Sequence, residues 1–165
     1  MKMNPVRFLM VSLGCAKNLV NSEQMTHLLI EAGFEAASGP ETADIAIVNT
    51  CGFIDSAASE AIDKVLELSE YKHSGKLKKI LMAGCLAQRY GDQVLKELPE
   101  VDGILGTGSY DDIVSAVKDV LSGEQVSEFG DIDAPVSETK REVSTPGYMA
   151  YIKIAEGCDN RCSYC

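Results

Sequence analysis

Three mainly apolar, strand-like segments, each followed by a cysteine, constrain the fold of this chain more than any other feature. The segments are residues 7–11, 44–50 and 80–84, and the cysteines that follow them are Cys15, Cys51 and Cys85. Short apolar runs without alternation are typical of strands that are buried on both faces of a parallel sheet. The sequence therefore predicts such a sheet, with a cysteine at the end of three of its strands.

The segments between these runs have helical periodicity. We expect helices over residues 22–32, from Asp55 or Ser56 to about Tyr71, through Tyr90 to Leu98 and over 110–123, with short strands at 34–37 and 101–106. Strands that alternate with helices form a parallel sheet covered on both sides. The predicted fold class is α/β, a three-layer α/β/α domain with a mainly parallel open sheet.

The organisation of the chain changes after residue 123. Residues 124–147 are polar and acidic with little periodicity, which indicates a linker, and residues 148–155 are again strand-like. We therefore expect a first domain over 1–123 and the start of a truncated second domain over 148–165. A chain of 165 residues is long enough for one full domain with its own core.

Composition limits the classes of function. No apolar run approaches the ~20 residues that span a bilayer, and no signal peptide is evident, so we expect a cytoplasmic protein without membrane contact. In that reducing compartment the six cysteines are more typical of metal ligands or reactive thiols than of disulfides. The net charge of -10 argues against a surface that binds nucleic-acid phosphates.

The three strand-end cysteines are expected to converge. Parallel strands place their carboxyl ends at one edge, and open α/β sheets bind ligands in the crevice beyond that edge. Each cysteine also has a neighbouring glycine, which lets the backbone approach a bulky group: Gly14, Gly52 and Gly84. We predict an iron–sulfur cluster with three thiolate ligands and one open iron. Ordinary buried cysteines and a zinc site are the alternatives, although zinc sites usually take four ligands in close pairs.

A second group of cysteines forms a C-x3-C-x2-C motif at Cys158, Cys162 and Cys165, with Tyr164 just before the third cysteine. Three thiolates at this spacing can wrap one small cluster and leave its fourth iron open. The motif resembles the signature of the radical S-adenosylmethionine enzymes, which implies that the free iron binds S-adenosylmethionine and that Tyr164 lies at the cofactor. Half a zinc site, a disulfide framework and chance are the alternatives.

A longer resemblance covers the whole chain in order. Four segments, 12–18, 49–55, 84–90 and 154–158, are similar to the methylthiotransferases, and within them to the RimO type. The resemblance implies two four-iron, four-sulfur (4Fe-4S) clusters, together with S-adenosylmethionine as cofactor. One cluster would be held by Cys15, Cys51 and Cys85 in an amino-terminal methylthiotransferase domain, and the other by Cys158, Cys162 and Cys165 in a radical barrel.

The resemblance also implies an activity for the complete enzyme, which would add a methylthio group to the β carbon of an aspartate in protein twelve of the small ribosomal subunit. Its partners would be that protein and an electron donor such as flavodoxin or ferredoxin. No side chain of this chain is assigned as a catalytic acid or base. We expect the chain alone to be inactive, because the barrel and the substrate-binding domain of the family do not follow Cys165.

Three other functions fit parts of the sequence. A transfer-RNA methylthiotransferase would share both cysteine groups, a non-enzymatic carrier would need only the first domain, and a zinc-binding structural module would use the same thiolates. A weaker hypothesis concerns the surroundings of the first cluster. Asn18, Asn49 and Thr50 lie near its ligands in the sequence and could donate hydrogen bonds to its sulfurs.

Overall fold

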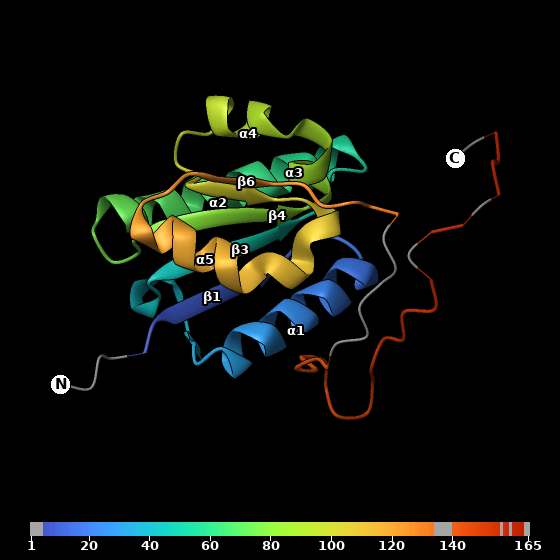
Figure 1. Cartoon of the computed structure of the whole chain (residues 1–165), viewed down its shortest axis with the longest axis horizontal. Coiled ribbons are helices and arrows are strands. Elements are labelled where there is room, and N and C mark those ends of the chain that lie inside the picture. Colours follow the sequence, from blue (N-terminus) through green and yellow to red (C-terminus); the bar gives the residue numbers. More distant parts are fainter. Residues whose placement is uncertain (1–4, 134–139, 156, 159, 164–165) are drawn as a thin grey trace.

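One parallel sheet forms the centre of the molecule (Figure 1). The computed structural model describes residues 5–133, 140–155, 157–158 and 160–163. Six strands pair in the order β2-β1-β3-β4-β5-β6, and every neighbouring pair is parallel. The strands are β1 Arg7–Ser12, β2 Glu35–Ala36, β3 Ile45–Thr50, β4 Lys79–Gly84, β5 Gly103–Leu105 and β6 Val126–Glu128. The predicted α/β fold with a parallel sheet is confirmed.

Helices cover both faces of this sheet. The α-helices are α1 Ala16–Glu31, α2 Asp55–His73, α3 Cys85–Tyr90, α4 Asp92–Glu97 and α5 Ile113–Ser122, and the 3-10 helices are η1 Pro40–Thr42 and η2 Thr107–Asp112. Side chains of α1 and α5 share one core with the sheet, and side chains of α2, α3 and α4 share the other. The described chain therefore has the three layers expected of an α/β/α domain (Figure 1).

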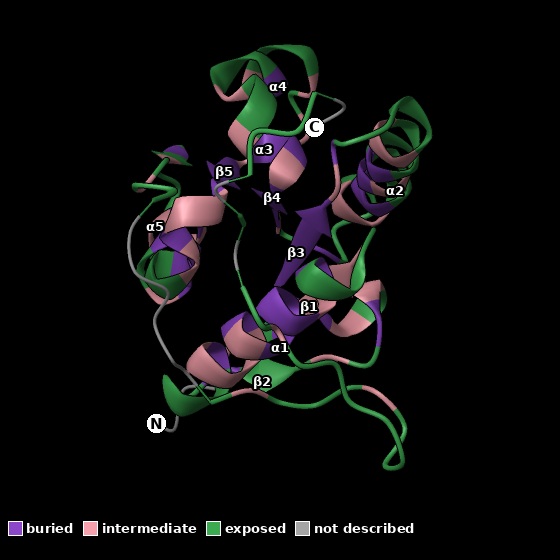
Figure 2. Ribbon diagram, turned by 90° about the vertical axis from the view of Figure 1, so that its right-hand side faces the viewer, coloured by how far each residue is buried: buried purple, intermediate pink, exposed green. Residues whose placement is uncertain are grey.

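The central strand β3 shows why these residues form a buried strand. All six of its residues are buried, and Figure 2 shows it as buried along its length. Ile45 and Ile47 enter the core on the α1 and α5 side, whereas Ala46 and Val48 enter the core on the α2 side. Full burial of a valine or isoleucine side chain is worth about 1.5–3 kcal/mol, so an uninterrupted apolar run is favourable only where both faces are covered.

The strand order creates a switch point between β1 and β3. The connection after β1 leads outward to β2, and the connection after β3 leads to β4 on the other side. Ligands of open α/β sheets bind in the crevice beyond the carboxyl ends at such a point. Cys15 follows β1 and Cys51 follows β3, so these two cysteines lie on either side of the switch point.

Two helix predictions need correction. Helix α1 begins at Ala16 rather than Ser22, because its first turns bury the polar residues Asn18, Asn21 and Glu23 and so lack the expected apolar period. The helix expected through Tyr90 and Leu98 is two short helices, α3 and α4, which are broken at Gly91.

After residue 123 the structure has one strand that was not predicted and lacks one that was. Strand β6 lies inside the segment that was expected to be an irregular linker; it pairs with β5, and Val126 is buried in the core beside α5. The strand-like residues 148–155 form no strand in the structure. Tyr148, Ile152 and Ile154 are 90%, 82% and 94% exposed, because no strand of the described chain lies beside them to pair with.

Among the residues that the structure describes, no helix combines the length and the apolar character that crossing a membrane requires.

Candidate metal centre

The structure brings Cys15, Cys51 and Cys85 to one edge of the sheet. Cys15 lies between β1 and the first turn of α1, Cys51 directly follows β3, and Cys85 follows β4 as the first residue of α3. Because β1, β3 and β4 are parallel neighbours, their carboxyl ends meet at the same edge. All three cysteines are free thiols, and all three are at least partly accessible to solvent.

Asn18, in the first turn of α1, connects the three cysteine-bearing ends. Its side chain is almost completely buried, and its Nδ2 donates to the carbonyl oxygens of Leu13 (3.1 Å) and Thr50 (2.9 Å). Its Oδ1 faces the thiols, 4.0 Å from the Sγ of Cys15 and 3.8 Å from the Sγ of Cys85. One amide therefore contacts the ends of β1 and β3 and the cysteine that follows β4.

Two glycines leave the space that this convergence needs. Gly14 has φ +90°, and a β carbon there would collide with the Cβ of Cys51 and lie 3.3 Å from its Sγ. Gly84 has φ +95°, and a β carbon there would collide with the Oδ1 of Asn49 and lie 2.6 Å from the carbonyl oxygen of Thr50. Each of these two positions therefore requires glycine for two reasons: its backbone has a positive φ, and a side chain would collide with a neighbouring residue.

The electrostatics of Cys85 show that the thiols influence one another. Burial raises the pKa of the Cys85 thiol above its usual value, and the neighbouring Cys51 and Cys15 raise it further, because a second and a third thiolate would repel the first. Lys17 acts in the opposite direction and lowers the same pKa. A positively charged group bound among the three sulfurs would relieve this repulsion, as metal ions do for coordinating thiolates.

The arrangement suits a cluster better than a single ion. Among the described residues, no group of three His, Cys, Asp or Glu side chains is placed to hold one metal ion. Strands β1 and β4 flank β3, and the Sγ atoms of Cys15 and Cys85 both lie within 4.0 Å of Asn18 Oδ1. In an iron–sulfur cluster each thiolate binds a different iron, so the sulfurs need not converge on one metal ion. An all-thiolate set of three therefore fits a four-iron cluster.

That Asn18, Asn49 and Thr50 donate to cluster sulfurs stays a prediction, and in the structure their donors have protein partners. Asn49 Nδ2 donates to the backbone oxygen of Asn18 (2.9 Å) and to Ser22 Oγ (3.0 Å), and Thr50 Oγ1 donates to the carbonyl oxygen of Ala83 (2.7 Å). Like the Asn18 amide, these donors are used by the protein itself. They hold the strand ends together rather than point at the thiols.

Two residues of the site were missed from the sequence. Arg89 Nη1 donates to the carbonyl oxygen of Gly52 (2.9 Å), which fixes the loop immediately after Cys51, and Lys17 acts on the pKa of Cys85. Arg89 follows Cys85 by four residues, which is about one helical turn. A cation one turn after a strand-end cysteine was a signal that could have indicated Arg89.

The second group of cysteines is not brought to the first. Cys158 and Cys162 are exposed, and the described part of their segment runs outside the α/β layers (Figure 1). Cys165 and Tyr164, the other residues predicted for the second cluster, lie outside the described residues.

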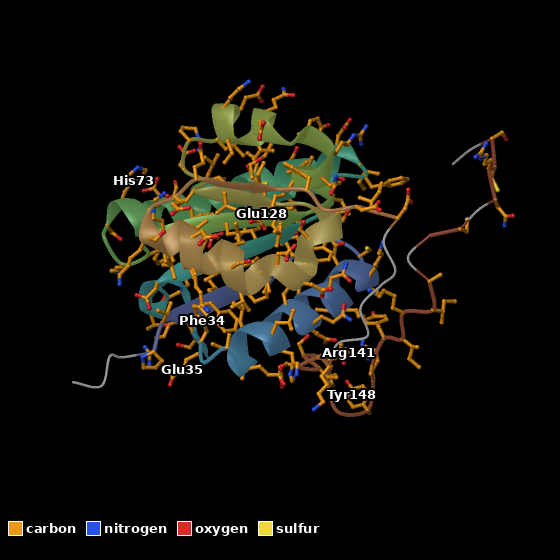
Figure 3. All side chains as sticks on the ribbon, viewed as in Figure 1. Phe34, Glu35, His73, Glu128, Arg141 and Tyr148 are labelled. Carbon is orange, nitrogen blue, oxygen red and sulfur yellow. The ribbon has the colours of Figure 1, made fainter. Side chains whose placement is uncertain are left out.

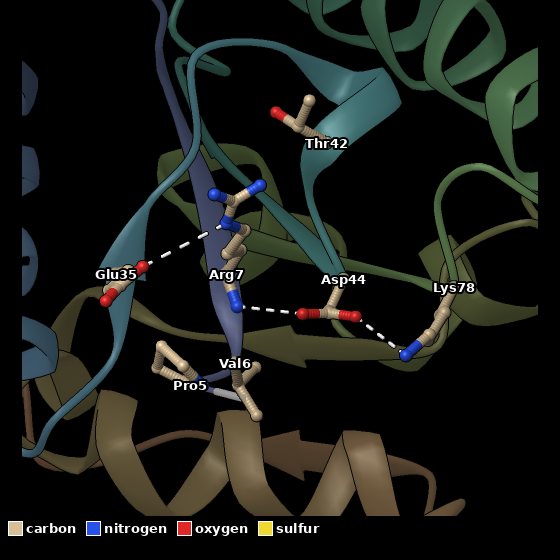
Figure 4. Close-up of a pocket in the computed structure, with 7 residues that line it drawn as sticks. All are labelled: Pro5, Val6, Arg7, Glu35, Thr42, Asp44 and Lys78. Carbon is tan, nitrogen blue, oxygen red and sulfur yellow. Dashed lines mark hydrogen bonds and ion pairs between the residues drawn. The ribbon is translucent and has the colours of Figure 1, made fainter. Parts of the chain in front are cut away.

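A pocket of about 640 Å³ lies away from the cysteines, where strands β1 and β3 begin (Figure 4). The charged side chains that line it pair with one another: Lys78 Nζ lies 2.7 Å from Asp44, and Arg7 Nε lies 4.0 Å from Glu35. The backbone N–H of Arg7 also donates a hydrogen bond to Asp44 (2.8 Å). These pairs stabilise the beginnings of the strands. They leave the cysteine edge as the better candidate for chemistry.

The chain is similar to known proteins over most of its length. A family model described as "Uncharacterized protein family UPF0004" matches residues 7–106. Proteins named "Ribosomal protein uS12 methylthiotransferase RimO" are similar over nearly the whole chain. Those of Lachnoclostridium phytofermentans, Clostridioides difficile and Caldicellulosiruptor saccharolyticus are 49%, 47% and 50% identical and cover 97%, 93% and 94% of this chain. The chain in turn spans only 37%, 35% and 36% of those proteins.

The family model extends over well over half of the 165 residues. Its range includes strands β1 to β5, Asn18 and the three converging cysteines. The chain therefore belongs to the UPF0004 family.

Proposed function

We propose that this chain is the cluster-holding α/β domain of a methylthiotransferase whose substrate is ribosomal protein uS12. The observation that carries the proposal is the convergence of three free cysteines at the ends of three adjacent parallel strands, joined by Asn18. The names and the 47–50% identity of the relatives support the choice of reaction and substrate over transfer RNA. Because the chain spans about a third of those relatives, the activity belongs to a longer protein.

The proposal assigns two cofactor sites. Cys15, Cys51 and Cys85 would hold one 4Fe-4S cluster, and Cys158, Cys162 and Cys165 would hold another, with Tyr164 beside S-adenosylmethionine. When bound, the clusters and S-adenosylmethionine supply the radical chemistry and sulfur transfer that no side chain provides, and the target is the β carbon of an aspartate. In this division the α/β domain ends after β6, and the radical domain begins near residue 148.

The residues of the α/β domain have positioning roles in this proposal. Three thiolates leave the fourth metal position open to a sulfur group, and the missing side chains of Gly14 and Gly84 let Cys51 and Thr50 pack closely against the turns. Asn18 and Arg89 hold the loops that carry the ligands in a fixed arrangement. A rigid ligand set favours cluster retention, because the thiolates need not be ordered on binding. The expected setting is the cytoplasm, with an electron donor such as flavodoxin or ferredoxin.

Iron and sulfide content after anaerobic reconstitution tests the cofactor assignment. The parent chain, a Cys15, Cys51 and Cys85 triple alanine variant, and a Cys158, Cys162 and Cys165 triple alanine variant are compared. We expect the second variant to keep about four irons with a brown absorption band, and the first variant to bind about four irons fewer than the parent. A second variant without iron, or a first variant with as much iron as the parent, would overturn the assignment of Cys15, Cys51 and Cys85. A colourless protein with stoichiometric zinc would identify a structural zinc module instead.

The reaction is tested separately, with the complete protein. Mass spectrometry of uS12 peptides after incubation with reductant and S-adenosylmethionine should show a methylthiolated aspartate, and the Cys51→Ala protein should produce none. If transfer RNA is methylthiolated and uS12 is not, the proposed substrate is wrong but the cluster assignment stands.

A further inference from the structure

A buried carboxylate on α1 holds a distant part of the chain. Glu23 is only 4% exposed, and its Oε1 accepts hydrogen bonds from the backbone N–H (2.7 Å) and the hydroxyl (2.8 Å) of Ser144. Its Oε2 lies 3.6 Å from Nη1 of Arg141. These partners are 118 to 121 residues away in the sequence (141 − 23 and 144 − 23), so the contact is tertiary.

Further contacts extend this attachment along the helix. The backbone N–H of Glu142 donates to the backbone oxygen of Glu23 (3.0 Å), and the carboxylate of Glu142 lies 2.8 Å from Nδ1 of His27. Near the start of the helix, Lys153 Nζ donates to Oδ1 of Asn21 (3.1 Å). Figure 3 shows Arg141 beside α1, and Figure 1 shows the chain from residue 140 onward passing along that helix. Residues 141–153 are called the α1 strap below.

The surface of α1 under the strap is built for a polar partner. Asn21 and Glu23 are both buried, although a helix of an α/β domain normally buries an apolar stripe and exposes its polar residues. A buried carboxylate is costly unless it is paired and hydrogen-bonded. The donors from Ser144 and the charge of Arg141 come from the strap, so the strap supplies what the burial of Glu23 requires.

We propose that Glu23 is a positioning residue, which anchors the α1 strap and thereby sets where the segment with Cys158 and Cys162 leaves the α/β domain. Helix α1 begins directly after Cys15, and Glu23 lies eight residues further on (23 − 15), which corresponds to about 12 Å along the helix. The anchor is thus rigidly connected to the first cysteine centre. As far as it concerns two clusters, this inference rests on the proposed function; the anchoring itself does not.

The anchoring makes a local prediction for the 165-residue chain. Hydrogen exchange should show protected amides at Glu142 and Ser144, which donate to the backbone and the carboxylate of Glu23. In Glu23→Ala we expect exchange at these amides to rise by about tenfold or more, while the amides of β3 keep their protection, since local opening does not require global unfolding. Glu23→Gln keeps an acceptor oxygen without the charge. The exchange rates of the Glu142 and Ser144 amides in this variant should therefore lie between those of the parent and those of Glu23→Ala.

Glu60→Gln is the control, because Glu60 is exposed and lies on α2, which packs on the opposite face of the sheet from α1 and the strap. It should leave exchange at residues 142–144 unchanged. If Glu23→Ala also loses the protection of the β3 amides, Ser144→Ala tests the same contact from the strap. Faster exchange at the Glu142 amide of Ser144→Ala, with the β3 amides still protected, supports the anchor. Two results would overturn the anchor. In the first, the amides of residues 142 and 144 exchange in the parent as fast as in an unstructured peptide. In the second, these amides are as protected in Glu23→Ala, Glu23→Gln and Ser144→Ala as in the parent.

Iron content separates this inference from the proposed function. Glu23→Ala leaves all cysteines in place, so the reconstituted variant should keep the iron bound by Cys15, Cys51 and Cys85. If the parent chain binds no iron but its amides at 142–144 are protected, the proposed function is contradicted and the anchor is supported. If the parent binds iron but these amides are not protected, the anchor is contradicted and the proposed function is supported.

Discussion

The side-chain oxygen of Asn18 lies 3.8 Å from the Sγ of Cys85, although the two residues are 67 positions apart. The nitrogen of the same amide holds the carbonyl oxygens of Leu13 and Thr50. The ends of β1, β3 and β4 therefore meet at one buried side chain. Displacement of that side chain would disturb the ligands of the proposed cluster together rather than one at a time.

Asn18→Ala should lower both stability and iron retention. The substitution leaves the buried carbonyl of Thr50 and the partly buried carbonyl of Leu13 without their donor, which should reduce the free energy of unfolding by about 1–3 kcal/mol. Iron should be lost to a chelator several-fold faster than from the parent. Asn21→Ala is the control, because Asn21 is buried on the same helix but contacts Lys153 instead of the cysteine loops. Equal iron loss from the two variants would show that Asn18 has no special role at the centre.

Gly14→Ala should damage the centre more than its backbone conformation alone explains. A non-glycine residue at φ +90° costs about 1–3 kcal/mol, and here the new β carbon would also collide with Cys51. Gly33→Ala is a matched control, since Gly33 has φ +89° and no atom within 4 Å of the same β carbon. Urea unfolding and iron content should show a similar backbone cost in both variants but cluster loss only in Gly14→Ala. Full iron content in Gly14→Ala would contradict the tight packing described for this turn.

Asp44 should contribute stability that disappears in acid. Burial acts to raise the pKa of Asp44, but hydrogen bonds from the backbone N–H of Arg7 and from Lys78 outweigh it, so this pKa lies below its usual value of 3.8. The contribution is fully present above the unfolded-state pKa and is lost as pH falls through the lower, folded-state pKa. Asp44→Asn should therefore cost about 1–2 kcal/mol at pH 7, and the difference from the parent should shrink below about pH 4. A difference that stays constant from pH 7 to pH 3 would contradict this assignment.

Arg89→Ala should loosen the loop after Cys51 without unfolding the domain. The arginine donates to the carbonyl oxygen of Gly52, and the next residue, Phe53, is 83% exposed, so little else holds this loop from the solvent side. We expect at most about 1.5 kcal/mol of lost stability and a faster loss of iron. Arg89→Lys retains the charge with a shorter reach and should be intermediate. Unchanged iron release in both variants would show that the Gly52 contact does not support the centre.

The sequence predicted β3 and β4 well, because residues 45–48 and 80–83 are apolar without interruption and are all buried. It predicted the position of β1, but only Phe8 of that strand is buried, so the expected burial of β1 on both faces is wrong. It also placed Cys15, Cys51 and Cys85 at one edge, since parallel topology decides where strands end. It did not predict the first turns of α1, where Asn18, Asn21 and Glu23 are buried through contacts with residues far away in the sequence. Polar residues buried in this way do not repeat with the apolar periodicity that predicts a helix. Strand β6 has only three residues, which is too short for a recognisable apolar pattern.

The all-parallel order of the sheet has a consequence for how the protein matures. No two neighbouring strands of this sheet can pair through a tight hairpin, so each pairing requires a crossover connection to close first, and sheets of this kind form slowly. Cys15, Cys51 and Cys85 become neighbours only once β1, β3 and β4 lie side by side. A newly made chain therefore presents the complete set of three thiols only after this tertiary structure has formed, so the proposed cluster would be loaded onto folded molecules.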